Sequence, residues 1–436
     1  PFMSNAITTE TYEAKVKMLK EKFEQVMGAG VRQIAILADD AGNQGSELYI
    51  KLMRDLVDWV SSDEMQQKYP GLKTTIPFCP EEYGRWGESW MSQLPEEVPV
   101  VMTGGKIWGE VTNDFTNSFS SNVGRGPYMW INWPCSDNSK RHLIMGGYAN
   151  FLHPGVNPEK IQGIVLNPMQ QSEPSKVAIF GNACYSWHIW EDAETAEQAW
   201  EDSFKYVDHE TFEQTEASDA LYELSKHMIN QNMDGRVVAL QESVKLAPKL
   251  TEFKSKLSAG TLTEDDISSM RKEFQKLAEA SKTYRESGNE RIAGQIVHWL
   301  DTWDNVTAAA DSLVSGLQPY YVDDDTTLVP SYYTAAQAQL EEAETHGFWY
   351  MDHTEYAEVG VQHIMPFLRT VRDQVATLAQ LSVDPTKLIA SPITNRTDAP
   401  SGSLANLLDG KTNTEVVFKN PNKITTGTYI GVTYNR

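Results

Sequence analysis

The sequence predicts an α/β fold over residues 1–190, a helical bundle over 191–390 and the beginning of a β-sandwich over 391–436. Three observations lead to this division. Short apolar runs alternate with amphipathic helical patterns in the first part, long helical periodicity fills the second, and helix breakers with short β-branched runs mark the third. Three domains also agree with 436 residues at roughly 150 residues per domain.

The first elements alternate between helix and strand. Residues 11–27 predict a helix, because apolar residues recur every three or four positions. The run IAILADD at 34–40 predicts a strand that is buried on both faces, and residues 46–59 predict a second helix. Further strand patterns follow at 74–80, 98–104, 127–134 and 163–168. Such alternation favours a parallel sheet.

Each predicted strand ends in polar or turn-forming residues. Functional groups gather at the carboxyl ends of the strands in a parallel β/α barrel, so this pattern favours a barrel over a doubly wound sheet. A closed barrel of this type needs eight strands, whereas about five are readable here. We therefore expect part of a TIM (β/α)8 barrel.

The second part has helical patterns only, and we expect no strands in it. Thr263 is the expected N-cap of one helix, with Asp265 and Asp266 in its first turn. The expected helices cover 193–206, 217–232, 236–257, 263–286, 290–316, 332–345 and 354–381. The tail then has strand patterns at 416–418 and 429–432, and it is too short to bury a core of its own.

Composition excludes several classes of function. Lys and Arg number 37 against 60 Asp and Glu, and the resulting net charge of -23 argues against nucleic acid or an anionic membrane surface as partner. Cys79, Cys135 and Cys184 have no CxxC spacing, so neither a disulfide framework nor a zinc ribbon is indicated. No apolar run approaches the roughly 18 residues of a membrane span. A start at Pro1 without a signal-peptide pattern leads us to expect a processed or partial chain.

The adjacent pair Asp39 and Asp40 is the clearest candidate for catalysis. Two carboxylates at the end of a buried strand reach one cavity, and their repulsion favours one acid and one ionised group. This arrangement suits glycoside hydrolysis, in which an acid protonates the leaving oxygen. The alternative is a polar strand end or a helix N-cap without a catalytic role.

Several aromatic residues with polar neighbours are candidates for stacking on sugar rings, with ordinary core packing as the alternative. They are Tyr83, Trp86, Trp90, Trp108, Trp130, Trp133 and Trp187. The run 323–325 (Asp-Asp-Asp) reads as a solvated turn or, less favourably, a cation site. No metal-binding histidine motif, Walker loop or complete dinucleotide fingerprint is present, so we expect no cofactor. Asn305 and Asn395 lie in glycosylation sequons, a pattern that arises often by chance.

Five motifs in order resemble glycoside hydrolase family 84, the β-N-acetylglucosaminidases and O-GlcNAc hydrolases. They are LADDAG (37–42), CPEEY (79–83), MTGGKI (102–107), WINWPCSD (130–137) and GIVLNPM (163–169) followed by SKVAIF (175–180). The resemblance covers the second part of that family's catalytic barrel, so it implies that only the carboxyl-terminal strands are present. Bacterial members carry a helical region after the barrel. The tail more weakly resembles a truncated, discoidin-like carbohydrate-binding β-sandwich.

The resemblance implies a retaining exo-β-N-acetylglucosaminidase with substrate-assisted catalysis through an oxazoline. Asp39 matches the residue that polarises the acetamido N–H, and Asp40 matches the general acid and base. Tyr83 matches the tyrosine that binds the acetamido oxygen. The remaining matches are substrate-binding positions: Thr103 and Trp130 around the acetamido methyl, Asn132 near the acetamido group and leaving oxygen, Asp137 and Asn167 at sugar hydroxyls, and Ile107 on the leaving-group side.

Departures from the family pattern also carry expectations. Ile131 and Asn138 stand where the family often has aromatic residues, which we expect to alter leaving-group preference only. The family's first barrel strands, with a glycine and a lysine that contact the sugar, have no counterpart here. We therefore expect an upstream segment of the same enzyme to complete the barrel. The alternatives are a hyaluronidase-like glycosidase, a non-catalytic glycan-binding protein or a helical scaffold. The resemblance of the appended modules implies a secreted or cell-surface bacterial location.

Overall fold

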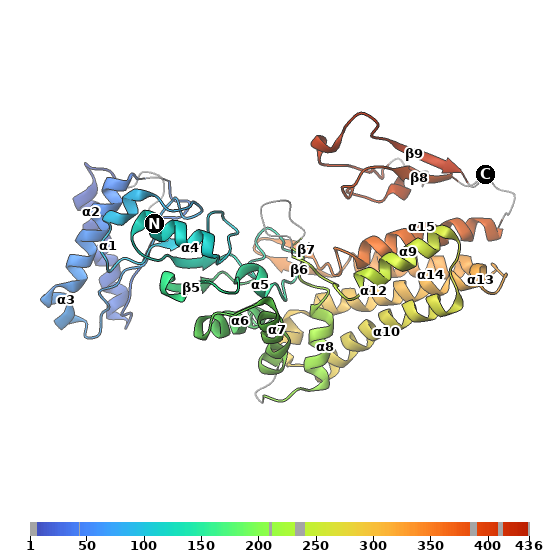
Figure 1. The fold of residues 1–436 in the computed structure, drawn as a ribbon, viewed down its shortest axis with the longest axis horizontal. Coiled ribbons are helices and arrows are strands. Elements are labelled where there is room, and N and C mark those ends of the chain that lie inside the picture. The colour runs from blue at the N-terminus through green and yellow to red at the C-terminus, as the bar shows by residue number, and fades with distance from the viewer. Residues whose placement is uncertain are drawn as a thin grey trace. The chain divides into compact units, whose positions relative to one another are not determined.

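A computed structural model describes residues 7–42, 44–208, 212–231, 240–383, 390–408 and 413–434 (Figure 1). The chain forms two compact units. The first comprises Pro1–Gln241 and Asn289–Gln295, and the second comprises Glu242–Gly288 and Ile296–Arg436. The three-domain division made from the sequence stays a prediction. No helix in the described ranges combines the length and apolarity that crossing a bilayer requires.

Short parallel strands form the centre of the first unit. They are β1 (Ile36–Leu37), β2 (Phe78–Cys79), β3 (Val101–Met102), β4 (Tyr128–Ile131) and β5 (Gly163–Leu166). β1 pairs with β2, and β4 lies between β3 and β5, in parallel register throughout. A parallel bridge from Phe78 to Val100 joins the two groups. The predicted parallel α/β arrangement is confirmed, and no closed barrel forms among the described residues.

The expectation that β1 is buried on both faces is wrong. Ile36 and Ala38 are 3% and 2% exposed, whereas Leu37 between them is 63% exposed. Ile36 and Ala38 lie against α2 (Ser46–Ser61) and line a small pocket with Leu48 of that helix. Successive side chains of a strand point to opposite faces, and within the described residues only one face of β1 is covered.

Several helices of the first unit match the sequence prediction, and one ends early. α1 (Tyr12–Gly28) and α2 match the two helices predicted first. α4 (Asn113–Val123) begins at Thr112, whose side chain accepts from the Phe115 N–H, and ends at Gly124 in the left-handed conformation. The others are α3 (Asp63–Lys68), α5 (Tyr148–Phe151), α6 (Lys176–Trp187), α7 (Ala193–Asp208) and α8 (Glu216–Ser225), which ends earlier than predicted.

One short helix of the first unit comes from much later in the sequence. α11 (Glu290–Gln295) breaks the predicted helix 290–316, and α12 (Val297–Ser315) begins after Ile296. The Glu173 carboxylate accepts a charged hydrogen bond from Arg291. The main-chain N–H of Glu173 donates to Gln295 Oε1 over 2.8 Å. These contacts explain why this segment belongs to the first unit.

The second unit is a helical bundle. Its helices are α9 (Ala247–Ala259), α10 (Glu264–Ser287), α12, α13 (Gln318–Tyr321), α14 (Val329–Ala343) and α15 (Ile364–Val383) (Figure 1). The predicted N-cap at Thr263 is confirmed, because its hydroxyl accepts from the Asp266 N–H in a capping box. α9 starts at Ala247, later than predicted, and residues 232–239 lie outside the described part.

The expectation of an all-helical second region is also wrong. β6 (Gly347–Tyr350) and β7 (His353–Tyr356) pair as an antiparallel hairpin, and α15 begins at Ile364 rather than near residue 354. Aromatic residues favour strands, and Met351 adopts a left-handed φ of 52° in the turn. In the tail, β8 (Ala390–Thr394) pairs with β9 (Ile430–Tyr434), whereas the predicted strand at 416–418 is reduced to one bridge at Val417.

Candidate functional site

The two aspartates lie at the point where the chain leaves the sheet. The Ala38 N–H still donates to the Cys79 carbonyl over 2.8 Å, so Asp39 and Asp40 are the first residues beyond the ladder. Asp39 is half-buried and Asp40 is exposed. Asp40 has a φ of 54°, a left-handed conformation that aspartate adopts more readily than most residues. This turn lets both carboxylates leave the plane of the sheet.

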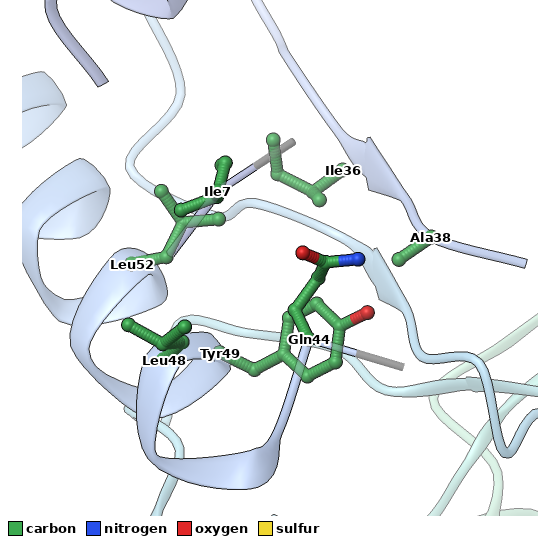
Figure 2. Close-up of a pocket in the computed structure, with 7 residues that line it drawn as sticks. All are labelled: Ile7, Ile36, Ala38, Gln44, Leu48, Tyr49 and Leu52. Carbon is green, nitrogen blue, oxygen red and sulfur yellow. The ribbon is translucent and has the colours of Figure 1, made fainter. Parts of the chain in front are cut away.

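Packing against α2 supports this turn. The Gly42 carbonyl accepts from Gln44 Nε2 over 2.9 Å and from the Tyr49 hydroxyl over 3.4 Å. Figure 2 shows a small pocket here, with the Gln44 amide beside Ala38 and Leu48 and Leu52 of α2 opposite. Its volume of about 10 Å³ corresponds to about one water molecule, which is far too small for a sugar. The pocket is therefore a packing gap between the strand at Ile36 and α2 rather than a sugar site.

Tyr83 reaches the aspartate pair from the turn after β2. Its hydroxyl donates to Asp40 Oδ1 over 3.4 Å, a long hydrogen bond, and its ring is buried. The ring stacks on Trp130, with centroids 5.5 Å apart and planes at 23°. Burial, followed by the charge of Asp40, raises the pKa of Tyr83 to about 12. The phenol therefore stays protonated and acts as a hydrogen-bond donor.

Thr103 links the turn after β3 to Tyr83. Its N–H and hydroxyl lie 3.0 and 3.2 Å from the Tyr83 carbonyl, and the hydroxyl lies 2.7 Å from the Lys106 carbonyl. Thr103 is fully buried. A Cβ on Gly109 would lie 1.7 Å from the Thr103 carbonyl oxygen, so only glycine allows the loop to fold this closely.

Two asparagines continue the site directly after β4 and β5. Asn132 Nδ2 donates to the Ile107 carbonyl over 2.8 Å, and Asn167 Nδ2 donates to Asn132 Oδ1 over 3.1 Å. Asn132 is buried and Asn167 is half-buried. The Ile107 side chain is 47% exposed beside this network. These hydrogen bonds hold both side-chain amides in a fixed orientation.

The two buried cysteines lie close beneath site residues. Burial, followed by the charges of Asp39 and Asp40, raises the pKa of the Cys79 thiol. Burial likewise raises the pKa of Cys135 to about 12, and this thiol also faces Asp137, whose side chain is exposed. Both thiols are neutral at physiological pH and are poor nucleophiles for that reason.

Contacts at or near the carboxyl ends of the parallel strands link most of the predicted site residues, whose roles stay predictions. Tyr83 contacts Asp40, Trp130 and Thr103; Asn132 links Ile107 to Asn167; and Cys135 faces both Asn167 and Asp137. A carboxylate pair beside a neutral phenol donor suits proton transfer at a glycosidic oxygen. No cluster of three metal-binding side chains occurs within the described ranges.

Other aromatic candidates have different environments. Trp133 is fully buried, with its N–H bonded to the Gly146 carbonyl, and Trp108 is nearly buried. Trp90 stacks on Tyr49, and Trp86 packs against Phe115 while staying 48% exposed. Trp187 is 91% exposed at the end of α6.

Other candidates from the sequence form contacts within the fold. Asp325 accepts from the Thr327 N–H in a turn. The Asn305 amide bonds Gln339 and His346, and the Asn395 amide bonds main-chain groups of Gly427 and Tyr429. Both sequon side chains are therefore occupied in folding contacts.

Sequence reasoning missed one charged group next to the site. Glu110 lies 2.7 Å from Lys106 and 2.9 Å from His153. The only signal in the sequence was the i,i+4 spacing of Lys106 and Glu110. This spacing brings side chains together on a helix, but these two residues lie in a loop, so it did not predict their contact.

Comparison with known proteins assigns the chain to a family. The profile of the beta-N-acetylglucosaminidase family matches residues 4–226, just over half of the chain. The chain belongs to this family. The predicted membership in glycoside hydrolase family 84 is thereby confirmed.

Two curated relatives of this family member are the protein O-GlcNAcases of Rattus norvegicus and Mus musculus. Each is 28% identical over 184 residues, which is 38% of this chain and 19% of the relative. The matched region is therefore about a fifth of their length.

Solved structures extend the similarity over more of the chain. CpGH84D has 28% identity and a TM-score of 0.75 over 86% of this chain and 62% of that one. CpGH84B has 20% identity and a TM-score of 0.68, over 85% and 63% of the two chains. A mutant of the Thermobaculum terrenum O-GlcNAc hydrolase has 14% identity and a TM-score of 0.67, over 87% and 79%. The last two show similarity of fold alone.

Proposed function

We propose that this family member is a retaining exo-β-N-acetylglucosaminidase that removes terminal β-linked GlcNAc by substrate-assisted catalysis. The observation that carries the proposal is the contact between the Tyr83 hydroxyl and Asp40 Oδ1 at the strand ends, within a chain of this family. The rodent relatives are O-GlcNAcases, which supports GlcNAc on protein as one substrate class.

In this proposal the acetamido oxygen of the sugar attacks its own anomeric carbon and forms an oxazoline. Asp39 accepts the acetamido N–H and stabilises the developing positive charge. Asp40 protonates the departing oxygen and then removes a proton from the attacking water. No enzyme nucleophile is required, which agrees with the neutral state of the buried thiols of Cys79 and Cys135.

The remaining residues hold the sugar. Tyr83 donates to the acetamido oxygen, while Thr103 and Trp130 surround the acetamido methyl. Asn132 lies near the acetamido group and the leaving oxygen. Asp137 and Asn167 bind sugar hydroxyls, and Ile107 contacts the leaving group.

The test is turnover of an aryl β-N-acetylglucosaminide by the wild type and by D39N. We expect wild-type release of GlcNAc, and a large loss in D39N because oxazoline formation slows with any leaving group. An unaffected rate in D39N contradicts the assignment of Asp39. No turnover by the wild type, with binding of an oxazoline-mimicking inhibitor retained, supports a non-catalytic glycan-binding protein instead. Internal cleavage of hyaluronan without release of terminal GlcNAc supports a hyaluronidase-like enzyme.

We further propose that an upstream segment of the same enzyme completes a TIM barrel around β1–β5. The exposure of Leu37 on β1 and Val165 on β5 supports this, because both lie on the outermost described strands of the sheet. A carbohydrate-binding role for the tail and a secreted or cell-surface location belong to the same proposal and rest on the family resemblance.

A further inference from the structure

Lys106 and Glu110, in the loop that follows β3, form a polar cluster with His153. Lys106 Nζ lies 2.7 Å from Glu110 Oε1, and His153 Nε2 lies 2.9 Å from Glu110 Oε2. The Glu110 side chain is only 16% exposed, and one oxygen of this largely buried carboxylate contacts the Lys106 ammonium while the other contacts the His153 imidazole. A charged hydrogen bond at such a site is stronger than one at an open surface.

This cluster closes the loop 103–110 on itself. The main chain of Lys106 and Ile107 supplies the carbonyls that accept from Thr103 and Asn132. Both carbonyls lie between Thr103 and Glu110 in the sequence, so a shift of Glu110 moves the two acceptors. Gly109 packs on the Thr103 carbonyl within the same loop and leaves little space for another conformation.

The other end of the cluster is fixed in the core. The His153 N–H donates to the Val111 carbonyl over 3.1 Å, and its own carbonyl accepts from the Tyr185 hydroxyl over 2.6 Å. Val111 also forms a parallel bridge with Leu152. The imidazole therefore ties the loop to a rigid part of the unit.

We propose that Glu110 is a positioning residue that Lys106 and His153 hold in place, and that it fixes Thr103 and Asn132 for the acetamido group. The same contacts make the order of the loop depend on pH through His153. The role toward the acetamido group rests on the proposed function, whereas the loop clamp does not.

The direction of the pH dependence follows from the groups that face His153. They are Glu110, Lys106, the main chain of Asn150 and the Tyr185 hydroxyl. The hydrogen bond to Glu110 raises the pKa of His153 above its ordinary value, against the opposing effect of burial. Burial favours a higher pKa for Glu110, but its bonds to His153 and Lys106 outweigh burial and lower the pKa of this carboxyl.

The clamp is therefore complete in mildly acidic solution. Its His153 contribution is fully present below the ordinary pKa of about 6.5 and is lost as the pH rises through the higher folded value. Its Glu110 contribution is lost only when the pH falls through the lowered folded value of this carboxyl, below about 4.3.

The experiment compares the wild type, E110Q and H153Q with H188Q, which replaces an exposed histidine of the same unit. Hydrogen–deuterium exchange of the peptide that covers 103–111 is measured at pH 6 and at pH 8.5. At pH 6 we expect roughly tenfold faster exchange in H153Q and E110Q than in the wild type, comparable to the loss of one charged hydrogen bond. At pH 8.5 we expect the difference between H153Q and the wild type to vanish, and H188Q to follow the wild type at both values.

Kinetics then test the role at the site. We expect KM for an aryl β-N-acetylglucosaminide to rise roughly three- to tenfold in H153Q at pH 6, with kcat changing less. The wild-type KM should rise toward the H153Q value as the pH increases. Exchange rates equal to those of the wild type in both variants at pH 6 overturn the clamp, whatever the enzyme assay gives. Faster exchange with an unchanged KM overturns the positioning role but not the clamp. An inactive wild type overturns the proposed function, and the exchange rates then still test the clamp.

Discussion

Asp40 combines an exposed carboxylate with a left-handed main chain and a contact to a buried phenol. Its φ of 54° directs the side chain out of the sheet toward Tyr83, which comes from the neighbouring strand end. The carboxylate is therefore accessible to substrate, while its partner is fixed by the stack on Trp130. A proton donor at a glycosidic oxygen needs this combination of access and orientation.

For D40N we expect a loss of kcat/KM that depends on the leaving group. An amide cannot donate the proton that a poor leaving group requires, whereas an activated aryl oxide leaves unaided. The loss should reach about 10²- to 10⁴-fold for an alkyl or peptide-linked sugar and be much smaller for a nitrophenyl sugar. Steady-state kinetics across a series of leaving groups measure this. Equal losses along the series contradict the role as general acid.

For Y83F we expect a loss of about 10²-fold in kcat/KM, because one donor to the developing oxazoline is removed. The ring still stacks on Trp130, so the midpoint of thermal unfolding should change little. Thermal denaturation beside the kinetic assay separates the two effects. A fall in stability that accounts for the whole loss of activity would mean that the hydroxyl is structural.

At this scale the sequence identified candidate residues but not the contacts between them. Asp39 and Asp40 were identifiable because adjacent carboxylates followed an apolar strand, and the other site residues because they lay in recognisable motifs. Glu110 and His153 were not, because they are 43 residues apart and only the folded chain brings them within 2.9 Å.

Among the elements, the loop after β3 is held by close packing and hydrogen bonds. It supplies Thr103 and the carbonyls that orient Thr103 and Asn132.

For G109A we expect displacement of this loop, since the new Cβ would lie 1.7 Å from a main-chain oxygen. G109A should lower the free energy of unfolding by about 1–3 kcal/mol, measured by denaturant titration. Its KM should also rise markedly. G28A is the matched control, because a Cβ there meets nothing within 4 Å. Equal effects of the two substitutions would refute the close packing at Gly109.

Element predictions succeeded where a regular pattern was long and failed where the chain changes pattern. α10 and its cap at Thr263 follow directly from periodicity and capping chemistry. The hairpin β6–β7 was missed because its buried Phe348 and Tyr350 alternate with exposed residues over only four positions. Burial of β1 was overestimated because an apolar residue such as Leu37 does not reveal whether anything covers it.

For the whole molecule, the apolar surfaces at the outermost described strands of the sheet matter most. Leu37 on β1 is 63% exposed and Val165 on β5 is 43% exposed, and α6, which follows β5, exposes Ile179 by 49% and Trp187 by 91%. If an upstream segment completes the barrel, co-expression of the corresponding segment of a family member should cover these residues. We expect a blue shift and reduced quenching of Trp187 fluorescence, measured as the difference from W187F. Unchanged quenching in an active complex would place that segment elsewhere.

The fold class was predictable at this scale because β/α alternation has few architectural solutions. The division of the chain between the two units was not, because the decisive contacts are single polar groups. Glu173 with Arg291, and Asp208 with the Asn289 N–H, bring α11 into the first unit, and neither contact leaves a periodic pattern.

That placement of α11 has a consequence for synthesis on the ribosome. The chain passes from one unit to the other three times, between residues 241 and 242, 288 and 289, and 295 and 296. The first unit lacks its last helix until residue 295 has emerged, by which time α9 and α10 of the second are already outside the exit tunnel. Neither unit is a contiguous stretch, so recombination cannot move either of them as a single uninterrupted block. The two are expected to be inherited together.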